Sequence, residues 1–371
     1  MSGRPVWAEI DLGAIRYNTA TIAKLVSPAG VCAVVKAGAY GHDPVKVSTA
    51  ALEGGASWLA VALVEEGAVL RQAGIDAPVL LLSEPPLAAM PEVVALHVTP
   101  TVYTLTGVEA AAKAVADTGA TPLDVHVKVD TGMRRVGALP ADAVAVARAV
   151  VDRPELRLQG LFTHFAVADQ PGHPFTEDQA ALLKGVVDKL AAAGIRPPLV
   201  HAANSAAALL GSTTGHSLVR CGIAIYGVPP SPALADRVVL RPALSLRAQV
   251  SHVKRVGAGE GISYGLCYRP ERPSTIATVP VGYADGVPWR LGRAGGEVLL
   301  GGRRRPIAGS VTMDQIMVDC GDDDVAVGDE VVLLGRQGDQ SLDAWEWAER
   351  AGTIAYEILC GIGPRVPKRY V

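Results

Sequence analysis

The sequence predicts an α/β protein, namely a (β/α)8 TIM-type barrel followed by a mainly β C-terminal domain. Its 371 residues are too many for one ordinary domain and fit a barrel of roughly 200–250 residues with a second domain. From residue 31 to residue 227, short β-rich runs alternate with alanine-rich helical runs, which is typical of βαβ units. After Tyr226 a proline-punctuated connection leads to strands with glycine-rich turns, so the architecture changes there.

The number of strand candidates decides the architecture, because eight parallel strands close this type of barrel. The candidates are Val31–Lys36, Trp58–Leu63, Pro78–Leu82, Leu96–Thr99, Leu123–Val129, Leu156–His164, Leu199–Ala203 and Ser217–Cys221. One connecting helix is predicted from Phe175 to Ala193, where Gly194 ends it. Residues at helical spacing on one face of this helix are Gln179, Leu182, Leu183, Val186 and Leu190.

The second domain is expected to begin near residue 240. We assign residues 11–238 to the barrel and residues 1–10 plus 239–371 to the β domain, because the strand-like Val6–Ile10 lies before the barrel and can join the later strands. The exception among those strands is Leu342–Ala351, which has an amphipathic helical pattern.

Composition excludes several classes of function. Hydrophobic residues at 49% and charged residues at 19% describe a soluble globular protein, and no apolar run approaches membrane-spanning length. The net charge of −3 lacks the basic excess of a nucleic-acid binder, and we interpret Arg303, Arg304 and Arg305 as a solvated turn. We therefore expect neither nucleic-acid nor membrane partners. The first residues show no export signal, so a cytoplasmic location is expected.

The cysteines are odd in number and widely scattered, with neither metal-ligand spacing nor a disulfide framework. We expect reduced, mostly buried thiols and no metal site. The five are Cys32, Cys221, Cys267, Cys320 and Cys360.

Polar residues gather at the carboxyl ends of the proposed barrel strands, the face where active sites of such barrels are built. They are Lys36, Lys128 with Asp130, His164, Asn204 with Ser205, and Arg220. Asn204 and Ser205 open a helix after the seventh strand, and Gly222 with Ile223 follows the eighth, so both strand ends suit a phosphate.

Lys36 is the only charge of a nearly apolar strand. A buried amine loses hydration, and its lowered pKa would make it a Schiff-base nucleophile. Taken singly, these residues have ordinary structural interpretations: Lys36 as a surface lysine, His164 as a core histidine, Ser205 as a helix cap and Arg220 as half of an ion pair. Their joint placement on one barrel face favours function.

Ten stretches, spread over nearly the whole chain, carry a resemblance to a known family. They are VWAEIDLGAIRYN, AVVKAGAYGH, VKVDTGMRRVG, LFTHFAVAD, HAANSAAAL, LVRCGIAIYG, GISYG, VPVGYADGV, VTMDQIMVD and RVPKRYV. Together and in this order they resemble alanine racemase, and chance agreement over ten stretches is negligible. The resemblance implies a barrel followed by a β domain. It also implies racemisation of L-alanine and D-alanine with pyridoxal 5'-phosphate, supplying D-alanine for peptidoglycan.

The resemblance implies that Lys36 carries the cofactor. Residues around the cofactor phosphate would be Tyr40, Asn204, Ser205, Gly222, Ile223 and Tyr356. Arg220 would face the pyridine nitrogen, which would stay unprotonated because a guanidinium keeps its proton at working pH. The resulting weaker electron sink limits side reactions and suits a racemase better than a transaminase.

Inverting a stereocentre needs proton removal on one face and delivery on the other, and Lys36 can serve only one face. The resemblance implies that Tyr264 of GISYG is the second base, contributed by the partner subunit of a homodimer with shared active sites. A hydrogen-bond chain through His164 to Arg220 would stabilise its phenolate.

The substrate carboxylate would be bound by Arg135 and by the backbone N–H of Met313, while Asp314 would be structural. Lys128 matches a lysine that is often carbamylated in the family. A carbamate would replace a cation by an anion beside Arg135, so the two basic residues could converge without repulsion.

The chain departs from the family pattern at five positions. Gly38 stands where the family usually has Asn, Ser310 where Arg is frequent and Thr312 where Cys is frequent. Trp289 replaces an Arg that usually follows GYADG, and Pro364 replaces a phosphate-contacting tyrosine of some members. None removes a predicted catalytic group, but substrate identity and cofactor affinity depend on this neighbourhood.

Three alternatives remain open from the sequence. The first is a racemase for serine or another amino acid. The second is a barrel-type pyridoxal-phosphate decarboxylase, which would carry a cysteine and aspartate pair in its β domain that we do not find. The third is a non-enzymatic pyridoxal-phosphate carrier protein, which is a lone barrel and lacks a β domain.

Overall fold

A computed structural model describes residues 3–211 and 215–371 of the chain. It divides into two compact units, each described by itself below. One unit comprises Ile15–Ala39 and Asp43–Arg241, and the other Met1–Ala14, Tyr40–His42 and Pro242–Val371. Within the described ranges, no helix has the length and apolar character needed to cross a membrane. Three cysteines, Cys32, Cys221 and Cys320, are buried, and two, Cys267 and Cys360, are exposed.

Over its described residues, the first unit contains eight strands in two parallel sheets, with the orders β4-β3-β2-β9 and β5-β6-β7-β8. Their bounds are β2 Gly30–Val34, β3 Ala56–Val61, β4 Val79–Leu81, β5 Thr101–Val102, β6 Leu123–Lys128, β7 Leu156–Phe162, β8 Leu199–His201 and β9 Leu218–Cys221. A parallel bridge between Leu80 and Thr99 joins the two sheets at one seam. At the other, the Ser217 amide donates to the Val200 carbonyl at 2.9 Å. The eight strands therefore close into a barrel, and the predicted fold class is confirmed.

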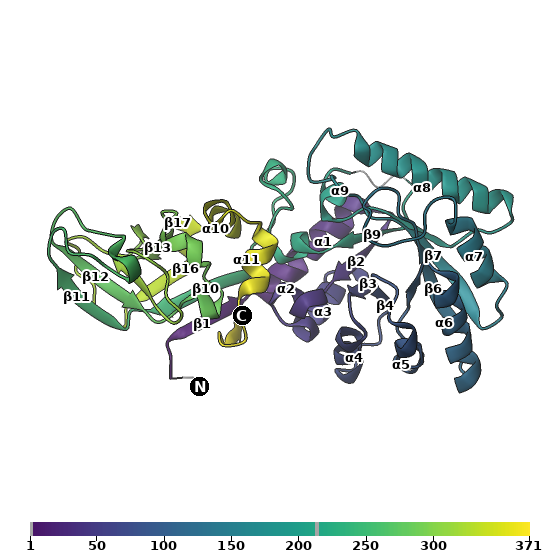
Figure 1. Ribbon diagram of the computed structural model, residues 1–371, viewed down its shortest axis with the longest axis horizontal. Helices are drawn as coiled ribbons and strands as arrows, with labels where there is room; N and C mark the ends of the chain where they lie inside the picture. Colours follow the sequence, from purple (N-terminus) through teal and green to yellow (C-terminus); the bar gives the residue numbers. More distant parts are fainter. Residues whose placement is uncertain (1–2, 212–214) are drawn as a thin grey trace. The chain divides into compact units, whose positions relative to one another are not determined.

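Helices connect these strands and lie on their outer side (Figure 1). Their bounds are α1 Leu12–Val26, α2 Lys36–Tyr40, α3 Pro44–Glu53, α4 Val64–Gln72, α5 Met90–Ala95, α6 Leu105–Thr118, α7 Ala143–Val151, α8 Phe175–Ala192 and α9 Ser205–Leu209. The strand interiors are buried and rich in Val, Leu and Ala, as expected for a parallel sheet covered by helices.

The strand predicted at Leu96–Thr99 is wrong over its first residues, because a turn that closes helix α5 stands there and only Thr99 bridges to Leu80. The amide of Leu96 donates to the Glu92 carbonyl (2.9 Å) and that of His97 to the Val94 carbonyl (3.1 Å), so both groups complete helix α5. Strand β5 begins only at Thr101. Leu96 and Val98 are apolar, as residues of a buried strand are. Their backbone amides, however, donate to carbonyls of α5 and so are not free for a strand ladder.

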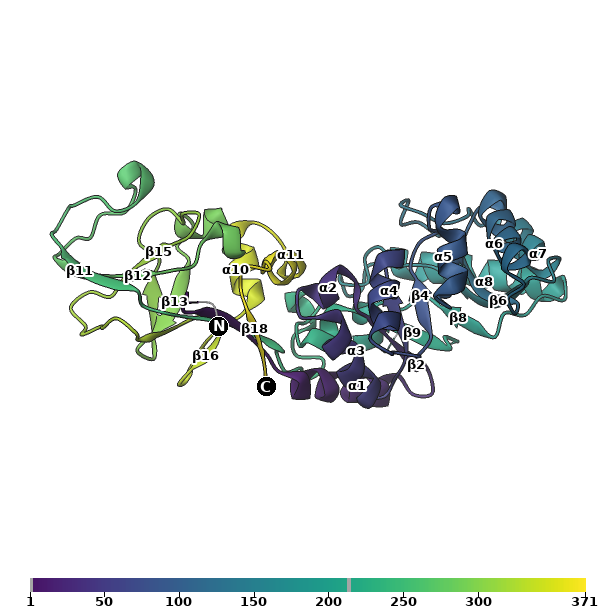
Figure 2. The same cartoon turned by 90° about the horizontal axis from the view of Figure 1, so that it is seen from below.

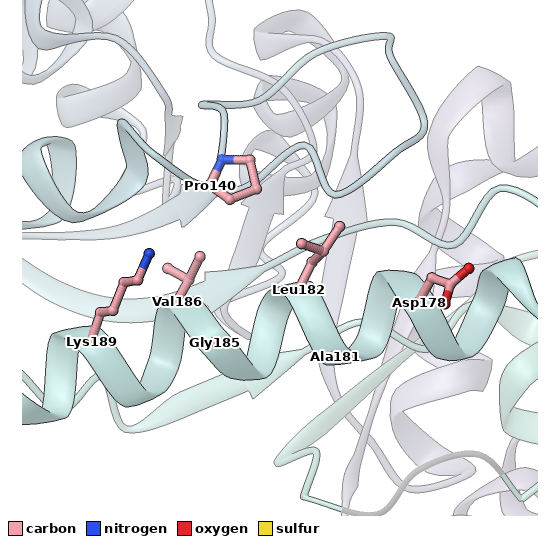
Figure 3. Close-up of a pocket in the computed structure, with 7 residues that line it drawn as sticks. All are labelled: Pro140, Asp178, Ala181, Leu182, Gly185, Val186 and Lys189. Carbon is pink, nitrogen blue, oxygen red and sulfur yellow. The ribbon is translucent and has the colours of Figure 1, made fainter.

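The predicted helix at residues 175–193 is present, but one residue of its predicted buried face is exposed. Leu183, Val186, Leu190 and Gln179 are buried, whereas Leu182 is 45% exposed. Leu182 lies at the edge of the apolar stripe and, with Val186, points toward Pro140 across a shallow surface hollow (Figure 3).

The second unit is mainly β, as predicted. Its larger sheet has the order β14-β13-β16-β10-β1-β18, with β17 paired to β16, and a smaller sheet has the order β11-β12-β15 (Figure 2). The bounds are β1 Val6–Ile10, β10 Leu244–Gln249, β11 His252–Val256, β12 Ser274–Val279, β13 Glu297–Leu300, β14 Arg303–Pro306, β15 Ile316–Asp319, β16 Glu330–Gln337, β17 Gln340–Leu342 and β18 Lys368–Tyr370. Strand β1 pairs antiparallel with β10 and parallel with β18, which confirms that the first strand joins the later ones. Helices α10 Ala344–Ala351 and α11 Ala355–Gly361 belong to this unit.

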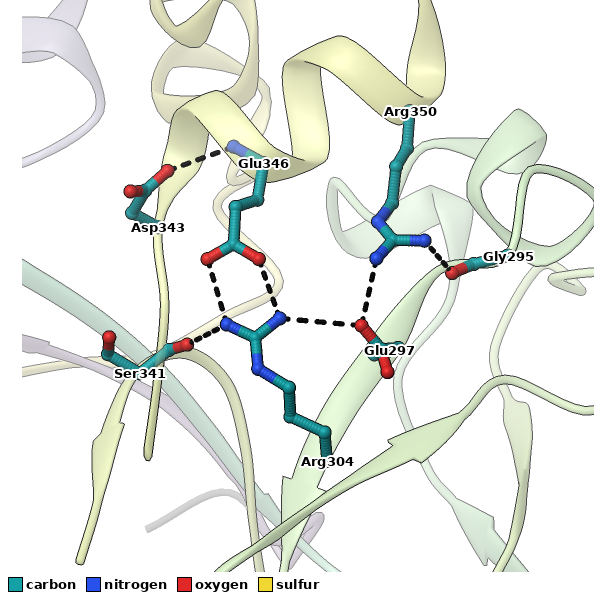
Figure 4. Close-up of polar contacts among 7 residues, drawn as sticks. All are labelled: Gly295, Glu297, Arg304, Ser341, Asp343, Glu346 and Arg350. Carbon is teal, nitrogen blue, oxygen red and sulfur yellow. Dashed lines mark hydrogen bonds and ion pairs between the residues drawn. The ribbon is translucent and has the colours of Figure 1, made fainter. Parts of the chain in front are cut away.

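The three consecutive arginines form a strand, so their interpretation as a solvated turn is wrong. The turn is made by Gly301 and Gly302, whose φ angles of 64° and 72° favour glycine. Arg304 of β14 then reaches Glu346 of α10 through two hydrogen bonds of 2.7 and 3.1 Å (Figure 4). The carboxylate of Glu297 accepts from Arg304 and, at 2.8 Å, from Arg350 (Figure 4). The arginines therefore fasten α10 to the sheet.

The helix α8 offers a matched pair of substitutions that tests its burial. Leu183→Ala should lower the free energy of unfolding by about 2–5 kcal/mol, because it leaves a cavity against the barrel. Leu182→Ala, one residue away, should change it by less than about 0.5 kcal/mol. Guanidinium unfolding of both variants measures the difference, and similar losses for the two would show that the buried face is misassigned.

Candidate active site

The barrel brings the predicted polar residues to one end of its strands. Lys36 follows β2 by two residues, and Lys128 is the last residue of β6. His164 follows β7 by two residues, and Arg220 is the next-to-last residue of β9. Because all these strands are parallel, the four residues lie at the carboxyl end of the barrel.

Arg220 is buried in the barrel, with 3% of its surface exposed. Its Nη1 donates to Nδ1 of His201 at 2.8 Å. Its Nη2 donates to the carbonyls of Thr163 (2.8 Å) and Ala202 (3.0 Å), and it lies 3.2 Å from Nδ1 of His164. Burial lowers the pKa of Arg220 to about 10, so the guanidinium keeps its charge at neutral pH.

The bonds of Arg220 determine where the protons of two histidines lie. A guanidinium can only donate, so Nδ1 of His201 accepts and its neutral ring carries the proton on Nε2. That Nε2 lies 3.0 Å from Nδ1 of His126, which therefore also accepts. Burial, and next the Arg220 charge, lowers the pKa of His201 well below 6.5, and burial lowers the pKa of His126 to about 3. Both rings are neutral at physiological pH.

His164 is held in the same way on the other side of the guanidinium. Burial lowers its pKa well below 6.5, and the charges of Arg220 and Arg135 add to this shift. Since Nδ1 of the neutral ring accepts from Arg220, Nε2 carries the proton and is available as a donor.

Lys128 has the environment of an amine that is neutral near physiological pH. Only 5% of the residue is exposed, and its Nζ donates to the Leu82 carbonyl at 2.8 Å. Burial lowers the pKa of Lys128 to about 7. The cations that add to this shift are, in order, Arg220, Arg135 and Lys36. Among the residues that the structure describes, none of these four basic side chains forms an ion pair with a carboxylate. Such a group of basic side chains suits an anionic ligand.

The segments proposed for a phosphate also meet in the barrel. Ser205 is buried and its Oγ accepts from the amide of Gly222 at 3.0 Å, which leaves the hydroxyl hydrogen able to donate to a ligand. Ile223 begins the next turn and is fully buried. Oδ1 of Asn204 accepts from the Ala207 amide at 3.1 Å, so this residue caps α9.

Lys36 opens a turn with left-handed backbone. The φ angles of Ala37, Gly38, Ala39 and Tyr40 lie between 53° and 62°. In the second unit, the ring of Tyr40 lies 6.2 Å from the ring of Tyr356. The two predicted phosphate-binding tyrosines are therefore neighbours.

Tyr264 and Met313 lie on linked segments of the β unit. Ser310 is buried, and its Oγ donates to the carbonyl of Tyr264 at 3.1 Å. The carbonyl of Ser310 accepts from the hydroxyl of Ser263 at 2.7 Å. The side chains at the ends of this linkage are exposed, Tyr264 by 75% and Met313 by 52%. In the same segment, the amide of Gln315 donates to Oγ1 of Thr312 at 3.2 Å and closes a turn.

Two other departures from the family pattern are Trp289 and Pro364. Trp289 is half exposed and its ring packs against the guanidinium of Arg293 at 4.9 Å. Nothing in the structure explains Pro364. In the described part of the chain, no group of three or more His, Cys, Asp or Glu side chains is placed to hold a metal ion.

The sequence analysis missed three residues of this site: His201, His126 and Glu66. His126 could have been found, because it precedes Lys128 by two residues and so shares its face of β6. Glu66 accepts one hydrogen bond from the backbone next to Lys36, and no motif in the sequence marks it.

Comparison with known proteins agrees with this architecture. Residues 10–230 match the family description "Alanine racemase, N-terminal domain", and residues 243–370 match "Alanine racemase, C-terminal domain". An alanine racemase of Symbiobacterium thermophilum is 45% identical over 368 residues, which cover 99% of this chain and 97% of that protein.

Solved structures show the same likeness. The crystal structure of alanine racemase from Streptomyces lavendulae matches with a TM-score of 0.94 and 39% identity, over 100% of this chain and 98% of that chain. A histidine racemase from Leuconostoc mesenteroides matches with a TM-score of 0.91 and 29% identity, over 100% and 99% of the two chains. Because two matched domains cover nearly the whole chain and a full-length relative is 45% identical, the chain belongs to the alanine racemase family, a family of isomerases.

Proposed function

We propose that this protein interconverts L-alanine and D-alanine with pyridoxal 5'-phosphate as cofactor. The observation that carries the proposal is the constellation at the barrel mouth: Lys36 after β2, with His164 hydrogen-bonded to a buried Arg220. Its membership of the alanine racemase family, and relatives named alanine racemase over their full length, support alanine as the substrate.

The residues present fit the proposed cofactor. Its phosphate and phenolic oxygen are anionic, and the described part of the barrel mouth holds four basic side chains that form no ion pair with a carboxylate: Lys36, Lys128, Arg135 and Arg220. Lys36 would hold the cofactor covalently. Residues proposed around the phosphate are Tyr40, Asn204, Ser205, Gly222, Ile223 and Tyr356. When bound, pyridoxal phosphate withdraws electrons from the substrate's α-carbon and so acidifies its C–H bond.

Two bases on opposite faces of the α-carbon would move its proton. We assign Nζ of Lys36 to one face and the phenolic oxygen of Tyr264 of the partner subunit to the other. A phenolate needs a donor, since the ordinary pKa of tyrosine is near 10. The protonated Nε2 of neutral His164 can supply that hydrogen bond, because its Nδ1 is occupied by Arg220.

The substrate carboxylate would be bound by the guanidinium of Arg135 and by the backbone N–H of Met313. Lys128 is proposed to carry a carbamate, which forms only on a neutral amine. The lowered pKa of Lys128 makes that form abundant at neutral pH. The carbamate would also place one negative charge among the cations of the barrel mouth.

The exposure of Tyr264 supports the proposed homodimer with shared active sites. A tyrosine that is 75% exposed is surrounded by water, whereas a catalytic base works best where water is excluded. Other large exposed side chains of the same unit are Leu266, Tyr283 and Met313. A partner barrel would cover them and supply Lys36.

We further propose a cytoplasmic enzyme that supplies D-alanine for peptidoglycan, with domain boundaries at residues 11–238 and 1–10 plus 239–371. The relevant second candidate is racemisation of another amino acid. It is favoured by the histidine racemase whose structure resembles this chain at 29% identity. Serine is the other amino acid whose racemisation should be compared with that of alanine.

Chiral analysis of product formed from alanine, serine, histidine and lysine tests the proposed function. Alanine should give the highest kcat/KM, and a higher value for any other amino acid would transfer the assignment to that substrate. Lys36→Ala should abolish racemisation and the borohydride-reducible chromophore, because the covalent anchor is lost. Lys24→Ala, at an exposed lysine of α1, should leave both unchanged.

Lys128 should take up carbon dioxide in a pH-dependent way. Below pH 7 the ammonium form dominates and does not react, whereas above pH 7 the neutral amine dominates, given its pKa of about 7. With 13C-labelled bicarbonate, NMR should show a protein-bound carbamate signal that is larger at pH 8 than at pH 6. The signal should be missing from Lys128→Met, and its persistence there would assign the carbamate to another lysine.

Subunit exchange tests the composite site. Lys36→Ala and Tyr264→Phe proteins, each inactive, should regain activity when unfolded together and refolded. Random pairing makes half of the dimers mixed, and one of the two sites in each mixed dimer carries neither substitution. Activity should therefore return to about a quarter of the wild-type value. Activity no higher than that of the separate variants would mean that Tyr264 serves its own chain.

A further inference from the structure

Glu66 is half-buried at the third position of α4, and both of its oxygens accept hydrogen bonds from backbone amides. Oε2 accepts from Ala62 (2.8 Å) and Leu63 (3.2 Å), at the end of β3. Oε1 accepts from Ala37 at 2.6 Å. One carboxylate therefore joins the end of β3 to the residue that directly follows Lys36.

The segment held by Glu66 has an unfavourable backbone conformation. Ala37, Ala39 and Tyr40 have φ angles of 54°, 54° and 53°, in the left-handed region that residues with a Cβ rarely occupy. The amide of Ala39 donates to the Val35 carbonyl at 2.9 Å, which secures the turn's interior. The Ala37 amide is the first of the turn, and its partner is the carboxylate. A turn of this kind persists only where its surroundings hold it.

A purely structural interpretation is that Glu66 caps α4. A Glu or Gln at the third helical position commonly accepts from the N-cap backbone amide, here that of Leu63. Capping uses Oε2 alone, and it does not require Oε1 to reach a different loop. A glutamine side chain has only one acceptor oxygen, so it could maintain the cap or the bond to Ala37, but not both.

We propose that Glu66 is a positioning residue that fixes the backbone beside Lys36 and so sets the direction of its amine. The inference rests on the proposed function in one respect, that Lys36 carries the cofactor and acts as a base. A displacement of about 1 Å at a reacting group can reduce a rate by roughly a hundredfold, so a loosened turn affects chemistry before it affects folding.

The decisive experiment is hydrogen exchange on Glu66→Gln, with Glu65→Gln as the matched control. Glu65 is exposed, precedes Glu66 in the first turn of α4 and carries the same charge. In Glu66→Gln, the amides of residues 37–40 should exchange at least about tenfold faster than in wild type. In Glu65→Gln they should exchange at the wild-type rate.

A second measurement separates positioning from stability. The kcat per cofactor-loaded site should fall roughly ten- to a hundredfold in Glu66→Gln, while its melting temperature stays close to that of Glu65→Gln because glutamine maintains the helix cap. A lower melting temperature with an unchanged kcat per loaded site would make Glu66 only a cap and overturn the proposal.

The outcomes also distinguish this inference from the proposed function. Unchanged exchange of residues 37–40 in Glu66→Gln overturns the positioning role even if wild type racemises alanine. The opposite case is faster exchange of residues 37–40 in Glu66→Gln, combined with a wild type that racemises no amino acid. That result would establish the bond from Glu66 to Ala37 and overturn the function proposed for Lys36.

Discussion

The buried guanidinium of Arg220 is the constraint on which the barrel's chemistry depends. A charge taken out of water must be compensated, and in the described residues no carboxylate pairs with this one. Its acceptors are all neutral: the carbonyls of Thr163 and Ala202 and the Nδ1 atoms of His201 and His164. Because the guanidinium can only donate, both histidines must be neutral and must carry their protons on Nε2. One buried cation thus determines two protonation states.

The same charge explains why the barrel mouth is suited to an anion. Arg220 lowers the pKa values of His164 and Lys128, although burial is the larger cause in each. Carboxylates at the loops bind backbone amides instead of these cations, and the charge of Asp130 offsets only part of the field at Lys128. Glu84 accepts from the amide of Thr104 (3.0 Å), and Oδ1 of Asp130 accepts from Gly132 (2.9 Å). The barrel therefore keeps its loops in place with anions while its cations remain for a ligand.

The sequence was sufficient for the features that depend on local pattern. The barrel followed from alternation of short runs, and Lys36, Lys128, His164 and Arg220 followed from their places at strand ends. The errors arose where two local patterns competed, as at Leu96–Thr99, where the end of α5 uses the backbone groups that a strand needs. Contacts between distant segments could not be predicted: 75 residues separate His126 from His201, and 29 separate Ala37 from Glu66.

The departures from the family pattern at Gly38 and Ser310 concern the backbone segments that carry the proposed bases, Lys36 and Tyr264. They do not change the two side chains themselves. Gly38 has a φ angle of 62°, a conformation that glycine and asparagine tolerate better than other residues, so glycine in place of asparagine preserves the turn after Lys36. Ser310 has a short side chain, and its hydroxyl reaches the Tyr264 carbonyl only because the residue is buried beneath that turn. An arginine at this position is too long for the same short contact and would carry a charge into a buried position. This chain therefore holds the segment of Tyr264 by a local neutral hydrogen bond to its backbone carbonyl.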